Sequence, residues 1–414
     1  FCASPKLSAM SAEGLVFERA YTATPLTVPS HASMLTGLSP AHHGVRDNLG
    51  FSLPAELATL PMLLGDAGYR TAAFIGGFPL VRANGHGLER GFDVYDDALG
   101  ETREEAGRRY PERAAPETIE KAEAWMRAAA PASPTFTWVH VFEPHDPYQP
   151  PRRWAAKAPT RYDGEVLFTD HVLGGLLTSI RQPAQLKHAL VIIVGDHGEM
   201  LGEKGERTHG IFLYESAVRV PLIVLWPAGS DGARGTVEHV VSVADVFPTI
   251  LSWCGLEVPS QIDGEPLVDR DGQVRARKQR ALYLETLHPR RRYGWSPIRG
   301  VLNWPWKYLE GPEAELYHLR TDPHERSPRE NAAVARRLSA RTRQTLRDDR
   351  WATSASVPAE ETLAALQSLG YVGSSPARQA DLFTDMDERP TATEGVAALP
   401  AIDEMAGPDR AAAV

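Results

Sequence analysis

The sequence has little cysteine, no long apolar run and no excess of positive charge. Its 414 residues include only two cysteines, Cys2 and Cys254, which excludes a disulfide framework and leaves the redox compartment open. No apolar stretch is long enough to cross a bilayer. The formal net charge of -9 argues against nucleic acid as the main partner. It does not exclude an anionic substrate, because a metal ion and a few histidines can make one pocket locally positive.

The sequence also lacks an initiating methionine, a signal peptide and an opening strand. It begins at Phe1, and we expect a fragment whose targeting segment would have preceded this residue. Beyond Gly373 the chain is rich in Ala, Pro, Ser, Asp and Thr and has little periodicity, which predicts a disordered tail over residues 374–414. The compartment and the oligomeric state stay open.

What the sequence does have is a repeated alternation of helix and strand patterns. With 43% hydrophobic residues it can build one large core, and the alternation predicts a layered α/β domain. From about Ala281, four short strand patterns and then a helix pattern at 331–347 predict a small antiparallel α+β subdomain. We therefore divide the chain into a catalytic domain at 1–275, a C-terminal subdomain at 276–373 and the tail.

An apolar run over residues 189–194 ends abruptly at Gly195-Asp196-His197-Gly198. The run predicts a central strand buried on both faces, with Asp196 and His197 at its carboxyl end, where open α/β sheets build their sites. Neighbouring strand residues point to opposite faces, so the two side chains share a ligand only if the strand has already ended. Their donor atoms suit Mn, Zn, Ca or Mg. The alternative is a turn with a solvated acid and a packed histidine.

Hydroxyl side chains gather in the segment 24–37, which also contains two prolines. The prolines predict a loop, and Ser30 is placed to cap a helix that ends at Gly37. A helix N-terminus favours an anion, so Thr27 is the candidate nucleophile and Ser30 the candidate cap. The alternative for Thr27 is a turn residue.

A third polar segment, Glu143-Pro144-His145-Asp146-Pro147, follows a strand pattern at 136–142. The two X-Pro pairs hold His145 in an extended loop, at the same sheet edge as Asp196. The alternative for His145 is an ordinary surface turn.

In their order along the chain, these segments resemble the sulfatase family of the alkaline phosphatase superfamily. The matching motifs extend from about Ser4 to about Gly373 and read TPLTVPSHASMLTG with PAHHGVRDN, VFEPHDPY, VGDHGE, HGIFLYESAVRVPLIV and WKYLEGPEAELYHLRTDPHE. The resemblance implies an alkaline-phosphatase-like layered sheet with helices on both faces. It also implies an ester hydrolase that uses one or two divalent metal ions.

The resemblance implies roles for particular positions, namely Thr27 as nucleophile, Asp196 and His197 as metal ligands, His145 and His209 at the transferred group or leaving oxygen, and His31 and Asn48 as substrate contacts. His209 stands where many members of the family have Lys, and His31 replaces the usual Arg. A first strand that ends in an Asp pair would lie upstream of Phe1.

One departure changes the expected chemistry. Family sulfatases convert a Cys or Ser nucleophile into formylglycine, and threonine cannot be oxidised to that aldehyde. A threonine alkoxide beside a metal is still a workable nucleophile. Because Thr27 resembles the nucleophile of the superfamily's phosphodiesterases and phosphotransferases, phosphate esters suit it at least as well as sulfate esters.

The sequence therefore predicts a metal-dependent hydrolase of sulfate or phosphate mono- or diesters. The ester would belong to a small molecule, a glycan or a lipid, and similarity to exported proteins suggests the periplasm or the exterior by analogy alone. The alternative is a non-catalytic protein that binds an anionic glycan or lipid headgroup in the same pocket. The altered nucleophile and the His31 replacement favour that alternative.

Overall fold

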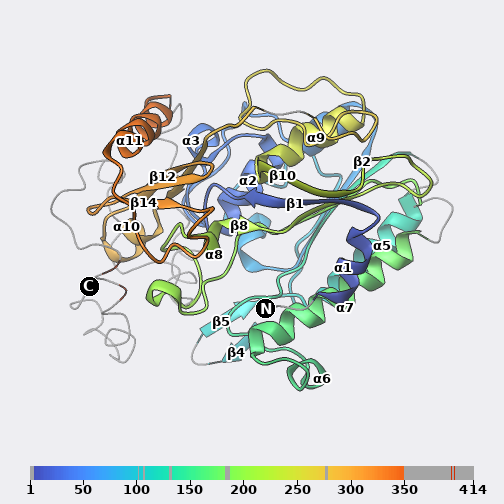
Figure 1. Ribbon diagram of the computed structural model, residues 1–414. Coiled ribbons are helices and arrows are strands. Elements are labelled where there is room, and N and C mark those ends of the chain that lie inside the picture. Colours follow the sequence, from blue (N-terminus) through green and yellow to red (C-terminus); the bar gives the residue numbers. More distant parts are fainter. Residues whose placement is uncertain are drawn as a thin grey trace.

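A five-stranded mixed sheet forms the centre of the computed structural model, which describes residues 4–100, 102–105, 108–129, 133–181, 187–275 and 278–348, with Thr393 and Val396 (Figure 1). Its strands are β1 (Gly14–Tyr21), β7 (Val191–Val194), β8 (Arg219–Val220), β9 (Leu222–Leu225) and β10 (Gly235–Ser242). The strand order is β10-β1-β9-β7, and β8 also pairs with β1. β1 runs parallel to β10 and antiparallel to β8 and β9, so both of its edges are hydrogen-bonded.

Helices cover both faces of this sheet. The helices are α1 (Pro5–Ser11), α2 (Thr27–Thr36), α5 (Ala115–Ala129), α7 (Arg161–Arg181) and α9 (Val246–Trp253). On one face, Met34 of α2 and Val246 of α9 pack with Leu15 of β1. On the other face, Ile119 of α5 and Leu176 of α7 pack with side chains of β7 and β9, such as Ile223. The predicted α/β layering, with helices on both faces, is confirmed.

A smaller parallel sheet also packs between helices, with Ala73 in the cluster that contains Val28 of α2 and Phe74 in the cluster that contains Ala122 of α5. Its strands, in the order β3-β2-β6, are β2 (Arg70–Ile75), β3 (Val94–Asp96) and β6 (Thr135–His140). The strand predicted at 136–142 is present, although it ends earlier, at His140. The remaining elements before residue 220 are short: α3 (Pro40–His43), α4 (Leu60–Asp66), β4 (Thr102–Glu105), β5 (Arg108–Pro111), α6 (Arg152–Ala155) and α8 (Glu215–Val218).

The apolar run at 189–194 forms β7, but the prediction of a fully buried central strand is wrong. β7 stands at one end of the strand order, and all four of its residues are half-buried. Its side chains do pack on both faces, with Ile192 in the cluster around β1 and Val191 in the cluster around α7. The run therefore correctly indicated two apolar faces. A strand at the end of a sheet can thus pack on both of its faces and still be only half-buried.

The C-terminal part is a four-stranded antiparallel meander covered by one helix. Its elements are β11 (Leu282–Thr286), the short helix α10 (His288–Tyr293), β12 (Ile298–Asn303), β13 (Trp306–Glu310), β14 (Glu315–His318) and the covering helix α11 (Ala332–Arg347). Leu338 of α11 packs on Val301, Tyr308 and Leu316 of the sheet. The four predicted strands and the predicted helix are all present. The domain boundaries at residues 275 and 373 stay predictions.

Two further findings concern the ends of the chain and the membrane. The predicted tail at 374–414 lies outside the described residues, apart from Thr393 and Val396, and Val396 is buried against the cluster that contains Met200 and Leu213. In the part of the chain that the structure describes, no helix has both the length and the apolar character needed to cross a bilayer.

Candidate active site

Thr27 is the first residue of α2, the helix that follows β1. The preceding Leu26 is extended and provides no side-chain cap. Instead, Oδ1 of Asn48 accepts a hydrogen bond from the backbone N–H of Val28 at 2.9 Å, which satisfies one of the free N–H groups of the first turn. Asn48 thus caps the helix with a residue from a distant part of the sequence. Thr27 itself is 4% exposed.

Ser30 is not the cap of this helix, as the sequence suggested. The helix begins three residues earlier, and Ser30 lies in its first turn. Its Oγ donates to the backbone carbonyl of Asp196 at 2.6 Å and accepts from Oγ1 of Thr22 at 3.0 Å. A proline in a first helical turn costs no hydrogen bond, so Pro29 does not delay the helix. Ser30 therefore ties the nucleophile segment to the end of β7.

Asp196 and His197 both lie beyond the last residue of β7, as their shared site requires. Nδ1 of His197 lies 2.8 Å from the carbonyl oxygen of Gly198. A carbonyl only accepts, so Nδ1 carries the proton and Nε2 of the neutral ring keeps its lone pair. That Nε2 lies 3.4 Å from Oγ1 of Thr27 and 3.6 Å from Oδ2 of Asp196. His197 thus stands between the hydroxyl and the carboxylate.

A possible metal-ligand set is formed by His31, His140 and Asp196, whose ligand atoms all lie within 4.8 Å of one another. His31 follows Thr27 by one helical turn, and His140 ends β6. Neither ring nitrogen of His31, nor Nδ1 of His140, has a hydrogen-bond partner among the described residues, although all are buried. Buried polar atoms without partners are rare, and a metal ion would satisfy these. The residues present therefore fit a divalent metal.

The protonation states of these residues also suit a metal. Burial lowers the pKa of His31 to about 4 and that of His140 to about 3, so both rings are neutral at pH 7. Burial opposes ionisation of Asp196, but the neighbouring His197 and His31 outweigh it and hold the pKa of this carboxyl below its usual range. Neutral imidazoles and an ionised carboxylate are the forms that bind metals.

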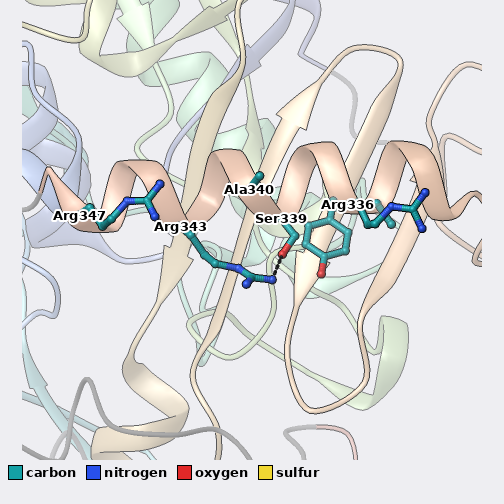
Figure 2. A pocket seen from close by; sticks show the side chains of 7 residues that line it. Arg336, Ser339, Ala340, Arg343 and Arg347 are labelled. Carbon is teal, nitrogen blue, oxygen red and sulfur yellow. Dashed lines mark hydrogen bonds between the residues drawn. The ribbon is translucent and has the colours of Figure 1, made fainter.

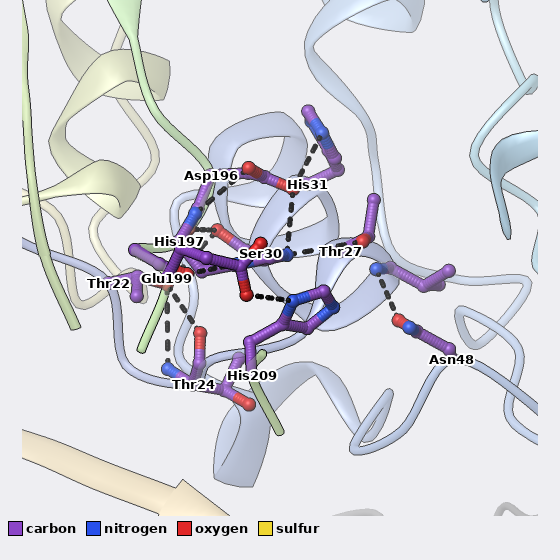
Figure 3. A network of polar contacts seen from close by, with 12 residues as sticks. Thr22, Thr24, Thr27, Ser30, His31, Asn48, Asp196, His197, Glu199 and His209 are labelled. Atoms are coloured by element: carbon purple, nitrogen blue, oxygen red, sulfur yellow. Dashed lines mark hydrogen bonds and ion pairs between the residues drawn. The ribbon is translucent and has the colours of Figure 1, made fainter. Parts of the chain in front are cut away.

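His209 faces the same space from the loop after β7. Its ring centre lies 4.2 Å from that of His197, and its Nδ1 lies 3.0 Å from Oε1 of Glu199. Burial lowers the pKa of His209, but the Glu199 carboxylate outweighs this effect and the net pKa is raised. A histidine whose charged form is favoured by a neighbouring carboxylate is suited to act as an acid. Figure 3 shows Glu199 beside His209, and Asp196 beside His31.

His145 lies near His209, with 5.4 Å between the ring centres. Its Nδ1 lies 2.7 Å from the carbonyl oxygen of Asp146, and burial lowers its pKa to about 4. The backbone of this loop is held by Glu165 of α7, whose carboxylate accepts from the N–H of His145 at 3.0 Å and from the N–H of Gln149 at 2.5 Å. His145 is therefore a neutral ring on an anchored loop.

Glu206 anchors the loop that carries His209 in a similar way. Its two oxygens accept from the N–H groups of Ile211, at 2.8 Å, and Phe212, at 2.9 Å. The side chain is almost fully buried, which raises the pKa of Glu206 to about 7. A carboxylate and two backbone amides thus fix the position of His209 from within its own loop.

The structure brings most of the predicted site residues into one cluster: Thr27, His31, His145, Asp196, His197 and His209. Oδ1 of Asn48 contacts the first turn of α2, and its role as a substrate contact stays a prediction. Sequence reasoning missed His140 and Glu199. Glu199 follows Asp196 and His197 in the same motif, and His140 ends a predicted strand beside His145, so position at a strand end was the signal for both.

A layered α/β fold that gathers a hydroxyl, a carboxylate and several imidazoles in one place is typical of ester hydrolases. The family model for sulfatases matches residues 3–256, and the model named N-sulphoglucosamine sulphohydrolase, C-terminal, matches residues 205–351. The chain belongs to the sulfatase family. The predicted family and class, an ester hydrolase of the alkaline phosphatase superfamily, are confirmed.

Curated relatives agree with this assignment. An arylsulfatase of Clostridium perfringens is 23% identical over 78% of this chain and 84% of its own length. The N-acetylgalactosamine-6-sulfatase of Mus musculus is 30% identical over 64% of this chain and 61% of its own length. The chain thus spans most of the first relative but less than two thirds of the second.

Solved structures show the same fold. One neighbour, described in complex with its substrate D-glucosamine-2-N,6-O-disulfate, has a TM-score of 0.68 and 20% identity, and the match covers 84% of this chain and 94% of that one. The phosphonate monoester hydrolase of Agrobacterium radiobacter has a TM-score of 0.67 and 19% identity, with 84% and 91% covered. One fold therefore carries both sulfate and phosphonate ester chemistry.

Proposed function

We propose that this protein hydrolyses sulfate or phosphate esters with Thr27 as its nucleophile. The observation that carries the proposal is the 3.4 Å distance between Oγ1 of Thr27 and the lone-pair nitrogen of His197. A hydroxyl nucleophile is weak unless a base or a metal activates it, and His197 is the nearest base. The reaction is a substitution at sulfur or phosphorus, followed by release of the acid group to water.

The proton transfers follow from the two histidines. Oγ1 of Thr27 attacks the sulfur or phosphorus atom while its proton moves to Nε2 of His197. His209, whose charged form the Glu199 carboxylate favours, gives a proton to the leaving oxygen as its bond to sulfur or phosphorus breaks. In the second step His209 takes a proton from water, which attacks sulfur or phosphorus, while His197 returns its proton to Oγ1 of Thr27 as the bond to Oγ1 breaks. The products are sulfate from a sulfate ester, phosphate from a phosphate monoester and a phosphate monoester from a diester.

We propose that His31, His140 and Asp196 hold a divalent metal. His197 is not a ligand in this proposal, because its only lone pair, on Nε2, takes the proton of Thr27. When bound, the metal would neutralise charge on the transferred group and lower the pKa of a nearby hydroxyl. Two imidazoles and one carboxylate favour Zn or Mn over Ca or Mg, because the latter prefer oxygen ligands.

The nucleophile decides between the two ester classes in this proposal. Threonine has no route to the aldehyde of the family's sulfatases, and an alkoxide suits phosphoryl transfer, where positioning and charge neutralisation provide most of the catalysis. We therefore place phosphate mono- and diesters first and sulfate esters second. The phosphonate monoester hydrolases among the structural neighbours support this order only through their shared fold.

The test is hydrolysis of matched aryl sulfate, aryl phosphate and diaryl phosphate esters by protein stripped of metal and then given Zn, Mn, Ca or Mg. We expect turnover only with metal, best with Zn or Mn, and loss of nearly all turnover in Thr27→Ala with an unchanged far-UV spectrum. Thr27→Ser is the matched control and should keep measurable turnover, because it keeps the hydroxyl. Full turnover in Thr27→Ala would remove Thr27 from the mechanism, and silence on every ester would favour a binding protein.

A further inference from the structure

The C-terminal sheet is covered by α11, and a groove of about 520 Å³ lies beside this helix. Figure 2 shows the groove with Arg336, Ser339 and Arg343 on the helix. None of the residues that line the groove belongs to the cluster around Thr27, so the groove gives no link between this sheet and the site. A link does exist at β11, the strand at one end of the sheet.

The carboxyl end of β11 contacts the segment that leads to the nucleophile. The backbone N–H of Glu285 donates to the carbonyl oxygen of Ala23 at 2.8 Å. Ala23 lies in the loop between β1 and α2, shortly before Thr27. The buried carboxylate of Glu285 lies 3.6 Å from Nε of Arg46, so a charged contact supports the same junction. This end of the strand is thus bonded to the chain just before the nucleophile.

The next residue of the strand, Thr286, contacts the loop that carries His209. Its Oγ1 donates to the carbonyl oxygen of Gly210 at 2.5 Å and accepts from the N–H of His288 at 3.3 Å. Thr286 is fully buried, so water does not compete for these contacts. Gly210 directly follows His209. The loop is therefore held from two sides, by Glu206 from within and by Thr286 from the C-terminal sheet.

The backbone at Gly210 is packed closely between the two parts of the molecule. Gly210 has a φ of 106°, in the left-handed region that favours glycine. A Cβ atom at this position would lie 3.2 Å from Cδ2 of His288 in α10 and 3.4 Å from Cδ2 of Leu26, the residue before Thr27. The loop with His209 therefore has little room to shift towards either neighbour.

We propose that the end of β11 sets the distance between the nucleophile Thr27 and the acid His209, with Thr286 as the positioning residue for His209. The inference rests on the proposed function, which assigns these roles to Thr27 and His209. Adjacent residues of one strand hold both segments, so a shift of either segment has to break a buried hydrogen bond. Proton transfer needs a heavy-atom distance of about 2.6–3.2 Å, which leaves little tolerance for a displaced ring.

The test compares Thr286→Val with a closely matched control, Thr249→Val. Thr249 is also fully buried, and its Oγ1 also donates to a backbone carbonyl, that of Asp245 at 2.6 Å, and accepts from a backbone N–H, that of Leu267 at 2.8 Å. It lies in α9, outside the cluster around Thr27. Valine keeps the shape of threonine without the hydroxyl, so both variants should lose similar stability in urea unfolding. A third variant, Thr286→Ser, keeps the hydroxyl.

Two leaving groups separate a positioning role from a general loss of structure. Phenol is a poor leaving group that needs the proton of His209, whereas para-nitrophenol leaves readily without it. The measured quantity is kcat/KM, which covers the steps up to release of the phenol and not the later hydrolysis at Thr27. We expect Thr286→Val to lower kcat/KM about 10-fold to 100-fold for the phenyl ester and less than about threefold for the para-nitrophenyl ester.

The control variants complete the kinetic test. Thr249→Val should lower kcat/KM for neither ester, and Thr286→Ser should recover most of the activity that Thr286→Val loses. The proposal is overturned if Thr286→Val loses nothing, if it loses equally on both esters, or if Thr249→Val loses as much.

Hydrogen exchange measured by mass spectrometry keeps this test separate from the proposed function. Backbone amides of residues 206–212 should exchange faster in Thr286→Val and at an unchanged rate in Thr249→Val, because only the former frees the loop from β11. If no ester is cleaved but this difference is found, the proposed function fails and the anchoring of the loop by Thr286 stands. Equal exchange in the two variants would overturn the anchoring, whether or not esters are cleaved.

Discussion

At the scale of single residues, the site depends on which histidine nitrogens are already engaged in hydrogen bonds. Nδ1 of His197 is held by the carbonyl of Gly198, and Nδ1 of His145 by the carbonyl of Asp146. By contrast, both ring nitrogens of His31 have no hydrogen-bond partner among the residues described here. Hydrogen-bonded histidines have a fixed tautomer, whereas His31 can turn its lone pair to a ligand. His31 can therefore offer either ring nitrogen to a metal ion, whereas His197 and His145 can each offer only Nε2.

A prediction for metal binding follows from His140. Replacement by Gln should weaken binding of Zn or Mn by about 100-fold or more, since even changes in supporting contacts of metal sites cost 10–100-fold. The affinity is measured by competition with a chromophoric chelator. His43→Gln is the control, because His43 is also fully buried but is hydrogen-bonded to Ser33. An unchanged metal affinity in His140→Gln would exclude His140 from the ligand set.

At the scale of elements, loops that carry site residues are held by buried carboxylates. Glu165 of α7 holds the loop with His145, and Glu206 holds the loop with His209. Each carboxylate accepts from two backbone N–H groups, which fixes a loop backbone more tightly than a single contact. Catalysis is sensitive to such placement, since a shift of about 1 Å can cost about a hundredfold in rate.

Removal of the Glu165 carboxylate should therefore affect rate more than fold. We expect Glu165→Ala to lower kcat by about 10-fold to 100-fold, because His145 loses its anchor. The matched control is Asp170→Ala in the same helix, whose carboxylate also accepts from two backbone N–H groups, those of Lys6 and Leu7, far from the site. Both variants should lose similar stability, measured by urea unfolding. Equal kcat values for the two variants would contradict the positioning role.

Glu206 should make the stability of the fold depend on pH. Burial raises its pKa from the ordinary value of 4.5 to about 7 in the folded chain, so the folded state holds this proton more tightly than the unfolded state. The stabilisation is fully present below pH 4.5 and is lost as the pH rises to about 7. The shift corresponds to roughly 3 kcal/mol.

This pH dependence is measured by urea unfolding at several values from pH 4.5 to pH 7.5. The advantage of the unaltered protein over Glu206→Gln should shrink across that interval, because glutamine does not titrate. Glu203→Gln changes an exposed residue of the same loop and is the control. Its free energy of unfolding should change with pH in the same way as that of the unaltered protein. If the free energy of unfolding of Glu206→Gln differs from that of the unaltered protein by the same amount at every pH, Glu206 does not titrate in this range.

Local sequence patterns predicted those strands well whose buried residues can be recognised from the order of apolar and polar residues. The apolar residues of β2 and the alternating residues of β11 to β14 all lie where periodicity placed them. β10 was missed, because it is an end strand and four of its eight residues are exposed, among them Glu238 and His239. An end strand needs few apolar residues, so its pattern is weak.

The site was predictable in its residue types but not in its contacts. The role of Asn48 as the cap of α2 depends on a bond that spans 20 positions, and His140 meets Asp196 only after two sheets have folded. Ser30 was misassigned for the same reason, since a local cap seemed necessary until Asn48 supplied the acceptor from elsewhere. Long-range partners leave no local signal in a single sequence.

At the scale of the whole molecule, a buried lysine links the C-terminal sheet to the main domain. Nζ of Lys307 in β13 lies 3.2 Å from Oε1 of Glu215 in α8 and 3.0 Å from Oε1 of Glu325. The second oxygen of Glu215 accepts from the hydroxyl of Tyr21, at the end of β1. One cation thus joins both sheets through charged groups of which Lys307 and Glu325 are fully buried and Glu215 is 12% exposed.

Lys307→Met should destabilise the whole fold, because it leaves two buried carboxylates without their cation. Loss of one partner from a buried ion pair costs about 3–5 kcal/mol. Thermal unfolding followed by circular dichroism measures the loss, and Lys187→Met, which changes an exposed lysine, should leave Tm unchanged. An unchanged Tm in Lys307→Met would mean that the carboxylates are satisfied without it.

The burial of α2 has a consequence for how this site can change over evolutionary time. All ten residues of the helix are buried, including Thr27 and His31. A substitution at the nucleophile position is therefore also a substitution in the core, where a side chain of different volume costs stability. Exchange among serine, cysteine and threonine changes the volume little. A lineage can thus replace one chemistry by another at this position and keep the same interior, while most other substitutions lose the fold before a new activity can be selected.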